Sequence, residues 1–85
     1  MTGETLLRRA AKLVAKRRKS YGDPAVLMAN IAARWSLTLG RPVTPAQVAL
    51  CLIDLKLARL AHDPAHLDSM IDLAGYAAVL REVAR

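Results

Sequence analysis

Four charged side chains and a tyrosine in the second half of this sequence are spaced so that they could act together on a ligand. Lys56 and Arg59 precede a proline break, and Asp68, Asp72 and Tyr76 follow it at steps of four residues, which place them on one helix face. If the two segments fold back on each other as helices, Lys56 falls opposite Asp72 and Arg59 opposite Asp68. The pattern therefore predicts two ion pairs among apolar neighbours.

These pairs have two interpretations, and the sequence leaves both open. In the structural one, which we favour, the charges are paired because losing one partner of a buried pair costs roughly 3–5 kcal/mol. In the functional one, the cations hold a phosphate and an aromatic ring stacks on a base, which makes a small-nucleotide pocket. The candidate pocket residues are Tyr21, Lys56, Arg59, Asp72 and Tyr76.

A second group of charges lies at the start of the chain. Residues 1–20 hold seven Lys and Arg against one Glu, whereas residues 21–85 hold six of each sign, so the net charge of +6 belongs to this first segment. Such a stripe suits nucleic-acid phosphates or an acidic protein surface. The candidate partner-binding residues are Arg8, Arg9, Lys12, Lys16, Arg17, Arg18 and Lys19. Arg17 differs from the others because it continues the apolar row of Leu6, Ala10 and Leu13.

The residues needed for common enzymatic sites are missing. A magnesium-dependent helical pyrophosphohydrolase needs clustered glutamates, and the chain has only Glu4 and Glu82, at opposite ends. The chain has no glycine-rich phosphate loop. The segment 62–66, which contains two histidines, offers no third nitrogen or sulfur ligand and is expected to be a solvated turn. We therefore predict a non-enzymatic protein with no cofactor and no metal.

The elements that must position these residues are expected to be four helices. Apolar residues recur at three- and four-residue steps, and no stretch alternates with period two. Asp23 before Pro24 and Thr44 before Pro45 are start signals, and Gly40 is a stop signal. The prediction is an all-α, compact four-helix domain over residues 1–85 with antiparallel neighbouring helices. The expected helices cover residues 5–19, 24–39, 45–61 and 67–84.

The amino-acid composition indicates whether the protein self-associates and in which cellular compartment it is expected. Hydrophobic residues make up 54% of a chain of 85, more than a small sphere can hide, so we expect a homodimer. Cys51 is the only cysteine and lies in an apolar run, so a buried, inert thiol is expected and an intrachain disulfide is excluded. No uncharged stretch is long and apolar enough to span a bilayer. We expect a reducing, intracellular location with no membrane contact.

Several segments taken together resemble a family of small proteins common in bacteriophage and prophage genomes. These segments are "YGDP", "IAARW", "GRPVTPAQVAL" and "KLARLAHDPAHLDSMIDLAGYAAV", which together extend over most of residues 17–78. The resemblance implies a phage origin, an all-helical fold and a location in the host cytoplasm. It implies no known activity, because the family carries only a domain-of-unknown-function label.

The sequence departs from the family pattern on its polar face. The family usually has an acidic residue and an amide where Lys16 and Arg18 stand here, and an Asn-Phe pair where Leu27 and Met28 stand. The basic first helix is therefore expected to be a specialisation of this chain. We predict a binding module that engages nucleic acid or an acidic protein surface, for instance as an inhibitor of a host system. The alternative is the small-nucleotide pocket.

Overall fold

Four α-helices account for nearly all of the chain in the computed structural model, which describes residues 1–84. This confirms the all-α expectation, and each helix end lies within two residues of its expected place. The helices are α1 (Gly3–Tyr21), α2 (Pro24–Leu39), α3 (Pro45–His62) and α4 (Leu67–Val83).

The helix ends follow the local signals in the sequence. The Asp23 carboxylate accepts the Ala25 N–H at 2.9 Å and caps α2. Thr44 and Gln47 form a reciprocal capping box at the start of α3, in which the Thr44 hydroxyl accepts the Gln47 N–H at 3.1 Å. Gly22 and Gly40 have φ values of +84° and +69°, so both turns use backbone conformations that favour glycine. The two sharp turns that set the course of α2 are therefore local properties of the sequence.

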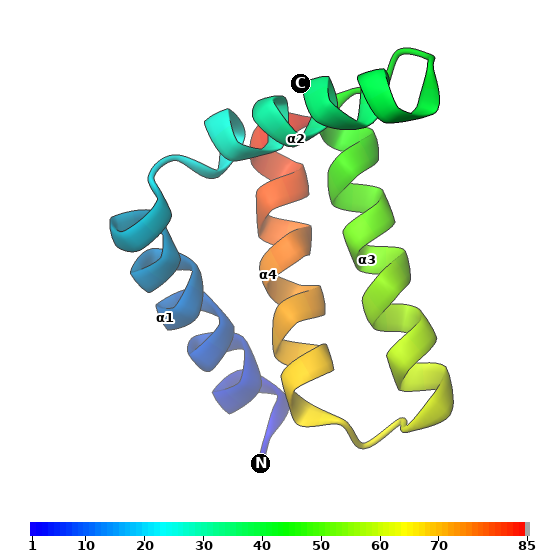
Figure 1. Ribbon diagram of the computed structural model, residues 1–85. Coiled ribbons are helices and arrows are strands. Elements are labelled where there is room, and N and C mark those ends of the chain that lie inside the picture. Colours follow the sequence, from blue (N-terminus) through cyan, green and yellow to red (C-terminus); the bar gives the residue numbers. More distant parts are fainter. Residues whose placement is uncertain (85) are drawn as a thin grey trace.

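Helix α4 is the centre of the arrangement, because it packs against all three other helices. Figure 1 shows α3 and α4 side by side and antiparallel, as the short connection between them predicts. Helix α2 lies across the ends of this pair. Helix α1 lies on the other side of α4 and runs in the same direction as α4 (Figure 1). The basic helix thus lies beside α4.

The hydrophobic core lies where α2 crosses α3 and α4. Met28, Ala32, Val48 and Ala49 are buried there, and Trp35 packs against them. The contact between α1 and α4 is separate from this core. Ala10 and Ile71 are buried, and a Cβ built on Gly75 would lie 3.5 Å from the Val14 methyl group, an ordinary van der Waals distance. Helix α1 is therefore joined to the rest by a narrow apolar contact.

The expectation of a buried Cys51 is wrong, because the thiol is exposed. Helix α3 packs on α2 and α4 with one side only, which leaves its other apolar side open to solvent. Leu50, Leu55 and Leu57 on α3 are each between 47% and 49% exposed. None of the helices in residues 1–84 is long and apolar enough to cross a membrane.

Replacing Thr44 with Ala tests the capping box. The substitution removes the hydroxyl that accepts the Gln47 N–H, and we expect it to lower the free energy of unfolding by about 1 kcal/mol in urea denaturation. Thr44→Ser keeps the hydroxyl and is the matched control. Equal stability of the two variants would show that the cap contributes nothing.

Candidate functional site

The carboxylate of Asp72 joins three helices. Its Oδ2 lies 2.9 Å from the Lys56 ammonium on α3, and its Oδ1 accepts a hydrogen bond of 3.3 Å from the Arg17 guanidinium on α1. The Lys56 and Asp72 side chains are only 10% and 17% exposed, whereas Arg17 is 45% exposed. The predicted Lys56–Asp72 pair is confirmed, and Arg17 is a second cation on the same carboxylate.

The second predicted pair, Arg59 with Asp68, is wrong. Both residues are exposed, and they form no ion pair within residues 1–84. An α-helix has 3.6 residues per turn, so Arg59 is rotated about 60° from Lys56, and Asp68 about 40° from Asp72. Only Lys56 and Asp72 lie on the line of closest approach. Arg59 instead borders a hollow at the α3–α4 turn, together with His62, Asp63 and His66.

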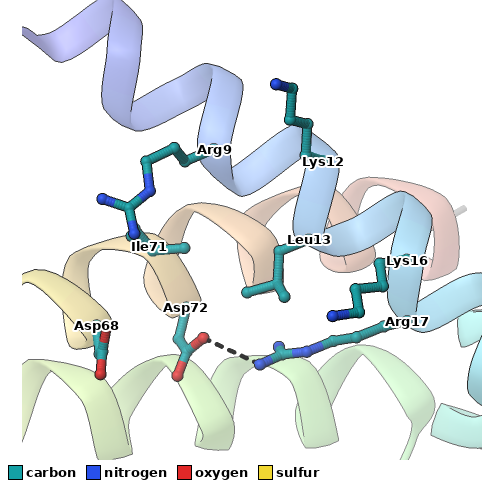
Figure 2. A pocket seen from close by; sticks show the side chains of 8 residues that line it. All are labelled: Arg9, Lys12, Leu13, Lys16, Arg17, Asp68, Ile71 and Asp72. Carbon is teal, nitrogen blue, oxygen red and sulfur yellow. Dashed lines mark hydrogen bonds and ion pairs between the residues drawn. The ribbon is translucent and has the colours of Figure 1, made fainter.

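A hollow of about 530 Å³ lies between α1 and α4, and we call it the basic hollow. It is lined by Arg9, Lys12, Leu13, Lys16, Arg17, Asp68, Ile71 and Asp72. Figure 2 shows the head groups of Arg9, Lys16 and Arg17 reaching toward α4, whereas the Lys12 ammonium points away from it. Three cations thus reach toward two carboxylates here, and one of those carboxylates already has two cationic partners.

The seven cations of α1 fall into two groups. Arg17 and Arg18 are held by carboxylates: Arg17 by Asp72, and Arg18 by Glu82 at 2.5 Å and Asp23 at 3.9 Å. The other five form no ion pair with any residue in the described part of the chain, and all five are exposed. They are Arg8, Arg9, Lys12, Lys16 and Lys19. The paired arginines attach the end of α1 to α4, and the other cations are exposed without a carboxylate partner among residues 1–84.

A second hollow, of about 360 Å³, adjoins the end of α1, and we call it the aromatic hollow. Tyr21 at the end of α1 and Tyr76 on α4 line it, together with Leu27 and Met28 of α2. Tyr21 is 74% exposed, which is unusual for a large aromatic side chain, and Tyr76 is half-buried. Arg17 lines this hollow as well as the basic hollow, so the two share a border.

The five residues of the candidate nucleotide pocket are spread over different sites. Tyr21 and Tyr76 lie together on the aromatic hollow, Asp72 lines the basic hollow, and Arg59 lines the hollow at the turn. Lys56 is buried on Asp72. Sequence reasoning missed Leu27 and Glu82 as neighbours of this region. No sequence signal could have shown that Glu82 meets Arg18, because 64 positions separate them.

The fold and the site define a small all-helical protein with a cationic helix bordering two hollows. The chain belongs to the family described as a domain of unknown function, DUF6378, whose model matches residues 5–84. This match agrees with the phage-family resemblance noted in the sequence. No solved structure matches the chain.

Two mycobacteriophage proteins are similar to this chain, and both are called Gene 55 protein. The protein of Mycobacterium phage L5 is 38% identical over 69 residues, which cover 80% of this chain and 44% of the relative. The protein of Mycobacterium phage D29 is 33% identical over 81 residues, which cover 94% of this chain and 54% of the relative. The chain therefore spans about half the length of the curated relatives it matches.

Replacing Asp72 with Asn tests the junction of the three helices. It leaves the nearly buried Lys56 ammonium without its counter-charge, so we expect the free energy of unfolding to fall by about 3 kcal/mol in urea denaturation. Asp54→Asn removes an exposed carboxylate from α3 and should change stability by less than about 0.5 kcal/mol.

A double variant separates loss of charge pairing from loss of packing. Lys56→Met in the Asp72→Asn background removes the unpaired buried charge and should recover much of the lost stability. If Asp72→Asn is as stable as Asp54→Asn, the junction does not stabilise the fold.

Proposed function

We propose that this protein is a non-enzymatic binding module that engages a polyanionic partner, nucleic acid or an acidic protein surface, through α1. The observation that supports this function most is that the cations of α1 divide into an ion-paired group and an exposed group. The carboxylates that form ion pairs with α1 bind Arg17 and Arg18, Asp68 borders the basic hollow without an ion pair within residues 1–84, and five further cations remain exposed. Ion pairs with acids of this chain therefore leave most of the stripe available.

The shape of the basic hollow supports the same function. Arg9, Lys12 and Lys16 follow each other at steps of three and four residues, which place them along one side of α1. Beside them α4 provides a wall with Ile71, an Asp72 that already has two cationic partners, and Asp68, which forms no ion pair with any residue that the structure describes. Three cations beside a single unpaired carboxylate leave an excess of positive charge, which attracts polyanions at low salt.

The relatives support a phage origin for this binding module, which would then act in the host cytoplasm. An inhibitor of a host system would use α1 to occupy a nucleic-acid site or to contact an acidic protein. The expected homodimer stays a prediction. The exposed leucines of α3 offer it an apolar surface that lies apart from the basic hollow.

Replacing Arg9, Lys12 and Lys16 with Gln tests this function. We expect the triple variant to lose most of its affinity for duplex DNA, single-stranded DNA or polyglutamate, measured by fluorescence anisotropy over a range of salt. For duplex DNA, the log-log salt slope should become shallower by about 2.7, since each neutralised phosphate contributes about 0.9.

Replacing Arg34, Arg41 and Arg81 with Gln makes the same change in net charge on other exposed surfaces and should leave binding nearly unchanged. The proposal fails if neither nucleic acid nor polyglutamate binds the native protein at low salt. It also fails if the two triple variants lose affinity equally.

A further inference from the structure

The two hollows on α1 share a border, and a single ligand can reach both. Arg17 lines each of them, and the cations of α1 lead from the basic hollow to Tyr21 at the end of the helix. We infer that the partner is single-stranded nucleic acid, whose phosphates follow the cations of α1 while one unpaired base enters the aromatic hollow. This inference rests on the proposed function and names the partner within it.

The length of the cationic row favours a strand over a free nucleotide. Arg9 and Lys16 are seven residues apart, which is about 10 Å along a helix at 1.5 Å per residue. Lys19 extends the row by nearly another turn toward the aromatic hollow. One nucleotide offers a single phosphate cluster and reaches only part of this row. A strand offers a phosphate at every nucleotide, so it can contact the whole row.

The aromatic hollow has the features of a base site. Tyr21 and Tyr76 provide two rings, and Leu27, which is 42% exposed, provides an apolar surface. Bases stack on aromatic side chains whatever their identity, because every base has a π face. The volume of about 360 Å³ lies at the lower end of the range for small-molecule pockets.

The guanidinium groups at the border are held in place before any ligand arrives. Arg17 is fixed by Asp72 and Arg18 by Glu82, and both line the aromatic hollow. A planar guanidinium can stack on an unpaired base while its edge keeps a carboxylate partner. A duplex gains nothing from this hollow, because its bases are stacked within the helix. An acidic peptide gains little, because it carries no base.

The test compares phosphate-bearing ligands that differ in whether they present unpaired bases along a strand. Fluorescence anisotropy is measured with a single-stranded oligonucleotide, an abasic strand of equal length, the corresponding duplex, and a free mononucleotide. We expect the abasic strand to bind about tenfold more weakly than the strand with bases, the typical scale of one stacked base. The duplex and the mononucleotide should also bind more weakly than that strand.

Tyr21→Leu removes the exposed ring and keeps an apolar side chain, so the fold should be unaffected. It should weaken binding of the strand with bases about fivefold to tenfold and leave the abasic strand unchanged. Tyr21→Trp keeps a stacking ring and is the matched control, which should bind the strand as tightly as the native protein does.

The other outcomes each overturn the inference in a recognisable way. If the abasic strand and the duplex bind as tightly as the strand with bases, the cations act alone, and only the proposed function survives. If the mononucleotide matches the strand, the ligand is a free nucleotide. If polyglutamate alone binds, the partner is an acidic protein. If nothing binds, both the inference and the proposed function fail.

Discussion

The structure depends on one carboxylate with two cationic partners. Asp72 lies on the central helix α4 and holds Lys56 of α3 and Arg17 of α1. The hydrophobic core lies at the far end, where α2 crosses α3 and α4, and it provides little contact for α1. The Asp72 junction, together with the Arg18–Glu82 pair, therefore fixes the basic helix in its place along α4.

This arrangement determines which charges remain available for a partner. Arg17 and Arg18 form ion pairs with Asp72, Glu82 and Asp23. The other five cations of α1 therefore lie beside few unpaired carboxylates. The same pairs hold α1 next to the tyrosine of α4, so that a cationic row ends at an aromatic hollow. The pairing of a nearly buried lysine is a structural requirement. It also helps to produce a surface that is cationic along α1 and aromatic at its end.

Much of the fold follows from short-range signals, and these could be read from the sequence. The caps at Asp23 and Thr44 depend on residues two or three positions apart, and the Lys56–Asp72 register follows from equal distances to the turn. The row that includes Arg17 indicated correctly that this arginine leaves the polar face. Its partner could not be predicted, because 55 positions separate Arg17 from Asp72 and no local pattern shows that α1 runs beside α4. The exposure of Cys51 was missed for a related reason, since apolar composition does not say which side of α3 other helices cover.

If the Asp72 junction makes the border of α1 and α4 a binding surface for single-stranded nucleic acid, a bound strand should perturb residues on both helices. Amide chemical-shift mapping by NMR, during titration with a single-stranded oligonucleotide, tests it most directly. The shifts should gather on residues 9–21 of α1 and residues 68–76 of α4. Shifts confined to the exposed leucines of α3, or no shifts at low salt, would contradict it.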